Sequence, residues 1–175
     1  MKLLLHICCA PCSIMVVDDL RRNNIDVTGY WYNPNIHPFT EYKSRMDTLK
    51  EYSSNINLEV IYNDYYGLKK FTKEVVSNIE NRCVKCYRMR LEETARYAKE
   101  NNYEAFSTTL LISPYQNHEL LKEVGEQLAK EYGIKFYYKD FRPVFKEGQR
   151  LAREKGLYMQ KYCGCIFSEE ERYLK

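Results

Sequence analysis

The chain has 175 residues, of which 45% are hydrophobic and 29% charged, and its formal net charge is +3. These values fit a soluble globular protein and exclude a largely disordered chain. The length predicts a single domain over residues 1–175, large enough to form a core without disulfide bonds. A weak positive charge does not by itself predict a nucleic-acid partner, because affinity for phosphate depends on where basic side chains cluster.

The N-terminal run from Met1 to Ile7 resembles the start of a secretory signal, but His6 interrupts it and no small-residue cleavage site follows. No segment offers about 18 consecutive apolar residues, so we expect no membrane span. We therefore expect a cytoplasmic protein, and reducing conditions there disfavour disulfides. Seven cysteines could not all pair in any case. Metal binding or thiol chemistry is thus the leading explanation for them.

The hydrophobic pattern predicts alternating strands and helices along most of the chain. We expect strands near residues 3–7, 27–32, 58–62, 104–108 and 134–138. We expect a first helix where Ile14, Val17 and Leu20 recur at helical spacing, and further helices near 40–52, 68–79, 83–101 and 116–131. Connections too long for hairpins imply a mainly parallel sheet with helices on both faces, which is a three-layer α/β sandwich. The tail from Phe145 to Lys175 is expected to form helical pieces interrupted around Cys163-Gly164-Cys165.

The cysteines form three groups in the sequence. These groups are Cys8, Cys9 and Cys12; Cys83 and Cys86; and Cys163 and Cys165. The first group follows the first predicted strand, at the edge where ligands gather in open α/β sheets. The second group opens a predicted helix, so its sulfur atoms share one face near an N-terminus that favours the thiolate. The third group flanks Gly164, whose backbone freedom lets two thiolates splay apart.

Thiolate ligands favour zinc or iron–sulfur clusters, and a cluster usually takes four cysteines. A cluster plus one metal ion with an open coordination position would account for all seven, whereas one closed four-cysteine zinc site would leave three over. The residues alone leave iron–sulfur and zinc open, and chance clustering of buried cysteines is a third possibility. Cys9-Ala10-Pro11-Cys12 also matches the thioredoxin-like redox motif, but that interpretation leaves the other cysteines unused.

Polar residues near these groups supply further candidates. Basic side chains around Tyr87 could hold RNA phosphates while the ring stacks a base, although a solvated helix face paired with acidic residues is the commoner arrangement. These basic residues are Arg82, Lys85, Arg88, Arg90 and Arg96. Tyr115 is a further candidate for RNA contact. Asp140 follows the fifth predicted strand and could ligate a metal or act as a catalytic acid, or simply cap the turn. We assign none of the three histidines as a ligand.

Several blocks, read together, resemble the cobalamin-independent epoxyqueuosine reductase family, QueH. They occur in family order along essentially the whole chain, which makes them more specific than any single pair of cysteines. One departure from the family pattern is Met159, where an arginine is expected. The blocks are His6-Ile7-Cys8-Cys9-Ala10-Pro11-Cys12, Asn33-Pro34-Asn35-Ile36-His37-Pro38, Arg82-Cys83-Val84-Lys85-Cys86-Tyr87, Thr108-Thr109-Leu110-Leu111-Ile112-Ser113-Pro114-Tyr115-Gln116, Asp140-Phe141-Arg142 and Tyr162-Cys163-Gly164-Cys165.

The resemblance implies two-electron removal of the epoxide oxygen of epoxyqueuosine in tRNA, which gives queuosine and needs an electron donor. It also implies a [4Fe-4S] cluster beside one further metal ion, expected to be iron, and a fold similar to the adenine-nucleotide α-hydrolase (HUP) type. We expect Cys83 and Cys86 to bind the cluster, with at least one of Cys8 and Cys9 and one tail cysteine, such as Cys165. The remaining cysteines, with a carboxylate such as Asp140, would hold the other metal.

Two other functions stay open. The same fold type includes ATP-dependent tRNA sulfur-transfer enzymes, but these need a Gly/Ser-rich phosphate loop after the first strand, where this chain has cysteines and a proline. A non-catalytic, zinc-stabilised RNA-binding module is the third hypothesis. Iron, sulfide and zinc analysis distinguishes these from the reductase.

Overall fold

The computed structural model describes residues 1–175. Its centre is a five-stranded sheet in the order β3-β2-β1-β4-β5, with every neighbouring pair parallel. The strands are β1 (Lys2–His6), β2 (Asp26–Trp31), β3 (Val60–Tyr62), β4 (Ala105–Thr108) and β5 (Lys135–Phe136). The helices are α1 (Ala10–Arg22), α2 (Phe39–Asn55), α3 (Leu68–Val75), α4 (Arg82–Glu100), α5 (His118–Tyr132), α6 (Phe145–Glu154) and α7 (Ile166–Tyr173), with short 3₁₀ turns η1 (Val76–Asn81), η2 (Thr109–Ile112) and η3 (Arg142–Val144).

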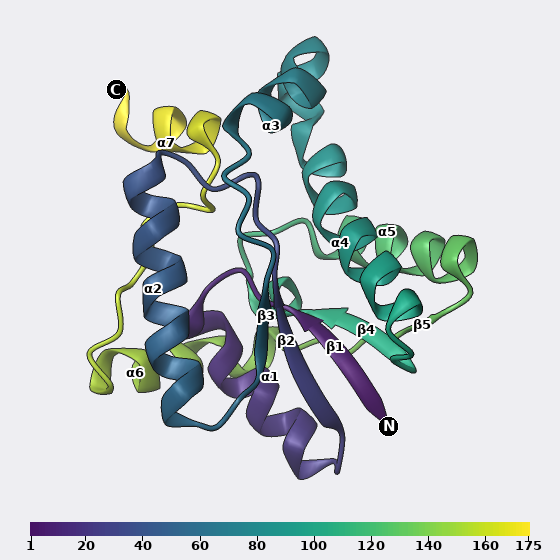
Figure 1. Cartoon of the computed structure of the whole chain (residues 1–175). Coiled ribbons are helices and arrows are strands. Elements are labelled where there is room, and N and C mark those ends of the chain that lie inside the picture. The colour runs from purple at the N-terminus through teal and green to yellow at the C-terminus, as the bar shows by residue number, and fades with distance from the viewer.

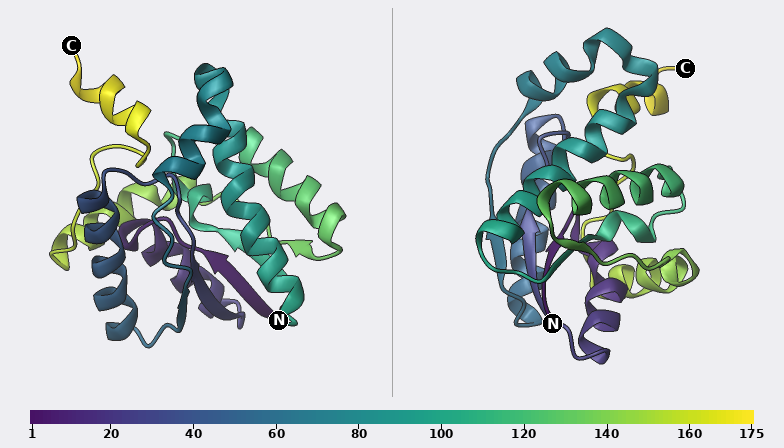
Figure 2. Two further views of the ribbon diagram at one scale, coloured as in Figure 1. Left: turned by 45° about the horizontal axis from the view of Figure 1, so that its top comes forward. Right: turned by 90° about the vertical axis from the view of Figure 1, so that its right-hand side faces the viewer.

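Helices cover both faces of the sheet (Figures 1 and 2). Helix α1 packs against α2 and α6 on one face, and α4 packs against α5 on the other. This arrangement confirms the predicted three-layer α/β sandwich with a parallel sheet. No helix combines the length and the apolar character needed to cross a membrane.

The central strand explains why the fold closes around the N-terminal residues. Leu3, Leu4 and Leu5 are fully buried, as a parallel strand covered on both faces requires. They belong to one connected core of 39 buried residues that runs through both helical layers. Apolar residues of α1 at helical spacing, including Val17 and Leu20, join the same core.

Most predicted elements are present, with changed boundaries. Helix α5 ends at Gly133, whose φ of +60° gives the predicted left-handed C-cap. The helix expected at residues 68–79 ends earlier, at Val75, and the chain continues as η1, inside which Asn78 has non-helical backbone angles. The fifth strand is only two residues long.

The carboxyl ends of all five strands lie at the same edge of the sheet. His6, the last residue of β1, pairs with Tyr30 on β2 and Thr108 on β4. Because the strands are parallel, the loops after them meet beyond this carboxyl edge. Helices α3 and α7 lie over it (Figure 1), and the rings of Phe71 and Phe167 connect them at 6.3 Å.

Candidate metal centre

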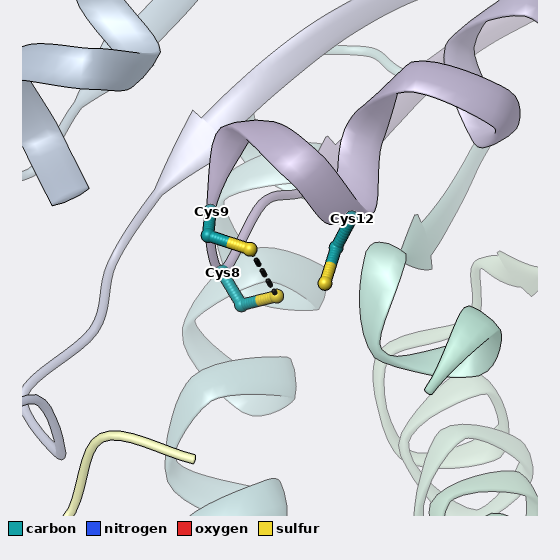
Figure 3. A group of neighbouring side chains, drawn as sticks. All are labelled: Cys8, Cys9 and Cys12. Carbon is teal, nitrogen blue, oxygen red and sulfur yellow. Dashed lines mark hydrogen bonds between the residues drawn. The ribbon is translucent and has the colours of Figure 1, made fainter. Parts of the chain in front are cut away.

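The first cysteine group forms a compact cluster directly after β1. The sulfur atoms of Cys8, Cys9 and Cys12 all lie within 4.8 Å of one another, and all three residues are buried. The three side chains point toward one another, with 3.9 Å between the sulfurs of Cys8 and Cys9 (Figure 3). Thr109, the first residue of η2 after β4, holds the backbone of this group in place, because its hydroxyl accepts from the Cys8 N–H at 3.2 Å.

This geometry fits one metal ion. A tetrahedral ion with metal–sulfur bonds of about 2.3 Å holds its thiolates about 3.8 Å apart, close to the Cys8–Cys9 separation. Hydrogen bonds from the Cys12 and Cys9 thiols lower the pKa of Cys8, while burial raises the pKa of Cys9. Metal binding would displace the thiol protons, because only deprotonated sulfur binds a metal ion.

The other two cysteine groups meet near α3. Cys86 and Cys165 are buried and pack with Phe71 and Val75 in a small cluster, whereas Cys83 and Cys163 are exposed. Cys165 caps α7, and its sulfur accepts the Ser168 N–H at 3.3 Å. The Cys163 thiol, this N–H and the Arg82 guanidinium lower the pKa of Cys165 to about 5. A thiolate, the form that binds metal, is thus favoured here.

A buried arginine holds the cysteine tail against α2. Arg45 is 1% exposed, and it donates to the carbonyl oxygens of Cys163 and Tyr162 at 3.0 and 2.8 Å. Between the two tail cysteines, Gly164 has a φ of +129°, a left-handed conformation that favours glycine. A Cβ there would also lie only 3.1 Å from an Arg45 nitrogen. The predicted role of Gly164 in this turn is confirmed.

The histidines serve structural roles. His6 is fully buried and contacts the Thr108 hydroxyl at 2.9 Å and the Asn33 side chain at 3.0 Å. His37 accepts the Ile166 N–H through Nδ1 at 3.2 Å, and its other ring nitrogen contacts the Pro34 carbonyl at 2.9 Å. Both rings connect the loops that carry the cysteines.

Three contacts connect the cysteine groups to one another. Cys12 and Cys163 line the same open cavity, whose volume is about 1200 Å³. Gln160 of the tail brings its amide nitrogen to 3.7 Å from the Cys12 sulfur. Arg90 of α4 donates to the Cys86 sulfur at 3.2 Å, and its charge also reaches Cys8 and Cys163. The chain therefore gathers all three groups at the carboxyl edge of the sheet.

Asp140 lies in a different setting from the one that a metal ligand needs. Its oxygens accept the Arg142 backbone N–H at 3.0 Å and the Arg142 guanidinium at 2.7 Å. These bonds lower the pKa of Asp140 to about 2. His118 lies 3.9 Å away, and no cysteine is among its polar contacts. In this structure Asp140 caps a turn, as one of the sequence alternatives has it.

The candidate RNA-binding residues differ in their availability. Arg82 donates to both carboxylate oxygens of Glu171 at 2.9 Å, and Arg88 pairs with Glu131 at 2.7 Å. Tyr115 is 84% exposed at the cavity, where its ring packs edge-on against Phe145 at 5.8 Å. Tyr115 is thus free to contact a partner, whereas both arginines already have carboxylate partners.

Sequence reasoning missed Arg45 entirely and treated Arg90 as a surface cation. Arg45 follows Glu41 by one helical turn, and its Nε donates to that carboxylate at 2.8 Å. That spacing was the only available signal, and it is common on exposed helices as well. Arg90 offered no signal at all, because its burial depends on how α4 packs against the cysteine loops.

Comparisons with known proteins identify the family of this chain. The family model described as epoxyqueuosine reductase QueH matches residues 3–171. This chain belongs to the QueH family. An epoxyqueuosine reductase QueH of Dehalococcoides mccartyi is 41% identical over 99% of this chain and 96% of that protein. The QueH of Thermotoga maritima is 37% identical over 97% of this chain and 91% of that protein.

The fold itself is more widespread than the QueH family. A predicted subunit of tRNA methyltransferase from Methanocaldococcus jannaschii superposes with a TM-score of 0.55 at 13% identity, covering 89% of this chain and 88% of that one. At such low identity the likeness concerns the fold alone. It agrees with the HUP-like fold that the sequence blocks implied.

Proposed function

We propose that this chain is an epoxyqueuosine reductase that acts on tRNA. The proposal rests on one observation: this chain, which belongs to the QueH family, gathers three cysteine groups at one edge of its sheet. In the reaction both carbon–oxygen bonds of the epoxide break and a carbon–carbon double bond forms. Two electrons and two protons are consumed, and the oxygen leaves as water. The electrons come from an external donor.

The grouping of the sulfur atoms supports a division of the ligands. Cys8, Cys9 and Cys12 suit one metal ion with an open fourth position, because their mutual spacing matches a single tetrahedral ion. The four cysteines that remain equal the number that a [4Fe-4S] cluster takes. This division differs from the sequence-based one, which assigned one of Cys8 and Cys9 to the cluster. The cluster ligands are then Cys83, Cys86, Cys163 and Cys165.

The two centres would have separate tasks. A cluster supplies electrons one at a time, and an adjacent iron ion with an open position acts as a Lewis acid toward an oxygen atom. The chain itself shapes the space between them. The cavity that Cys12 and Cys163 line also presents Gln149, Gln160 and Ser113, which can hydrogen-bond a polar nucleoside.

The same cavity supports tRNA as the partner. Five cationic side chains line it, and none of them forms an ion pair within the chain: Lys146, Arg153, Lys161, Arg172 and Lys175. Unpaired cations can take phosphate partners without losing a carboxylate. The exposed Tyr115 ring beside them can stack on an unpaired base. Arg82 and Arg88 could bind tRNA phosphates only by giving up their carboxylate partners, Glu171 and Glu131.

The proposal has consequences for the whole chain. A tRNA substrate implies that the protein works in the cytoplasm. One connected core supports residues 1–175 as a single domain that carries both centres. The sulfur-transfer alternative is weakened, because the loop between β1 and α1 contains cysteines and a proline in place of the glycines of a phosphate loop. A zinc-stabilised RNA-binding module remains the alternative that metal analysis must exclude.

The decisive experiment combines metal analysis with turnover. Anaerobically purified protein is analysed for iron, sulfide and zinc, then incubated with a reduced donor and tRNA that contains epoxyqueuosine. Mass spectrometry of the digested tRNA should show loss of one oxygen without cobalamin or ATP, and omission of the donor should stop it. If the protein carries only zinc and forms no queuosine, the reductase assignment is wrong. If it instead transfers sulfur to tRNA when ATP is added, the sulfur-transfer assignment takes its place.

A further inference from the structure

Three arginines are buried in this chain, and they differ in what neutralises them. Arg45 pairs with Glu41 at 2.8 Å, and Arg82 pairs with Glu171 at 2.9 Å. Arg90 is 3% exposed, yet none of the ion pairs in the structure involves it. A guanidinium stays charged at every physiological pH, and burying it without a counter-charge is costly. Arg90 therefore needs an anion from another source.

The surroundings of Arg90 identify that source. Its Nη2 donates to the Cys86 sulfur at 3.2 Å, and its Nε donates to the Cys86 carbonyl at 3.3 Å. Burial opposes the charge, but Cys86, Cys8, Tyr87 and Cys163 together hold the pKa of Arg90 above its ordinary value. The charge of Arg90 also acts on Cys83 and on His6, which is neutral because burial lowers its pKa to about 4.

The acceptor that can balance Arg90 is thus the Cys86 sulfur that it contacts, because metal binding would hold that sulfur as a thiolate. The Tyr87 phenol is unsuited to this task, because burial raises its pKa and its hydroxyl donates to Gln116 at 2.7 Å. The ring of Tyr87 contributes only a cation–π contact at 5.9 Å from the guanidinium. Because Arg90 is buried, donates to a metal-binding sulfur and has no carboxylate partner, its charge calls for an assembled centre that carries net negative charge.

We propose that Arg90 is the fixed counter-charge of the thiolate-bound redox centre, a positioning residue that raises the reduction potential of that centre through its charge and its N–H···S hydrogen bond. This inference rests on the proposed function, since it requires a redox-active centre. Each added electron increases the negative charge next to Arg90, so the guanidinium stabilises the reduced form more than the oxidised form. Charge and hydrogen bonds to sulfur are among the factors that set cluster potentials.

The test compares Arg90→Gln and Arg90→Lys with the wild-type protein. Arg90→Gln removes the charge and should shift the reduction equilibrium at least about tenfold toward the oxidised form, which is about 59 mV for one electron. Arg90→Lys keeps the charge and should stay within about threefold of wild type. The potential is measured by anaerobic redox titration followed by absorbance and electron paramagnetic resonance, with iron and sulfide counted in each sample.

Arg96→Gln is the matched control, because Arg96 lies on the same helix but is exposed and pairs with Glu93 at 2.6 Å. It should leave the potential unchanged. An Arg90→Gln variant with full iron content and a wild-type potential overturns the inference. Where Arg90→Gln fails to assemble the centre, Arg90→Lys decides: assembly with a near-wild-type potential supports the inference, and failure or a tenfold shift overturns it. A wild-type protein without a redox-active centre overturns this inference and the proposed function together.

Discussion

Each cysteine group lies at the N-terminus of a helix. Cys9 is the N-cap of α1, Cys83 is the second residue of α4, and Cys165 is the N-cap of α7. Free backbone N–H groups and the helix dipole favour anions at such ends. Metal binding requires thiolates, so these helices lower the free-energy cost of deprotonation where the ligands are needed. At the scale of single residues, the backbone thus adds to the positive charge that Arg82 and Arg90 bring to the cysteines.

The division of ligands predicts different effects for two cysteine variants. Cys86→Ser should abolish the visible iron–sulfur absorbance, because a cluster that lacks a buried thiolate ligand is labile. Cys12→Ser should keep that absorbance and about four irons per chain, since only the single-ion site loses a ligand. The measurement is iron and sulfide content together with absorbance after anaerobic reconstitution.

Each of these variants serves as the control for the other. Equal loss of absorbance in both would show that Cys12 belongs to the cluster. Intact absorbance in Cys86→Ser would remove Cys86 from the ligand set.

The role of a residue can be predicted from sequence when its side chain has few possible uses. The three cysteine groups could be recognised from spacing alone, because cytoplasmic thiols in such numbers have few other uses. Arg90 could not, since the same residue on an exposed α4 would be an ordinary surface cation. Arg82 and Arg88 were candidates for phosphate contact for that reason, and only the structure reveals Glu171 and Glu131 beside them.

At the scale of elements, α2 fixes the position of the cysteine tail. Arg45 connects Glu41 on its own helix to the carbonyls of Tyr162 and Cys163. Arg45→Ala should destabilise the protein by about 3–5 kcal/mol, because it leaves a buried carboxylate without its partner and frees the tail. Denaturant unfolding measures the stability, and limited proteolysis should show earlier cleavage near Lys161.

Arg150→Ala is the control for Arg45→Ala. Arg150 pairs with Glu147 and Glu154 on the exposed face of α6. It should leave the unfolding midpoint and the proteolysis pattern unchanged, because exposed pairs contribute little. If Arg45→Ala unfolds and is cleaved like wild type, the tail is held by its other contacts.

The sequence predicted the elements better than their ends. Periodicity predicted α1 without its ends and located α4 within one residue at each end, since each helix buries an apolar stripe. The end of α3 at Val75 and the shortness of β5 have no signal in the local pattern of apolar residues. The tail from Phe145 to Lys175 gives another example. Its interruption was predicted from Gly164, but its attachment to α2 through Arg45 was not.

At the scale of the whole molecule, charge is distributed unevenly over the surface. Arginines on α4 pair with carboxylates of the same helix and of α5 and α7, so that surface is largely neutralised. Cations around the cavity have no such partners, and they line the same cavity as Cys12 and Cys163. A tRNA that docks by its phosphates would thereby bring an unpaired base to the cysteines.

This distribution predicts which lysine matters for tRNA binding. Lys161→Ala removes an unpaired cation at the cavity and should weaken binding while reducing the slope of log K against log salt by about 1. Lys130→Ala is the matched control, because Lys130 is exposed in the last turn of α5, the helix that returns the chain to the start of β5. It should change neither quantity. Filter binding across a salt series, with metal content checked, provides both values. If Arg88→Ala flattens the slope and Lys161→Ala does not, tRNA docks along α4 and not at the cavity.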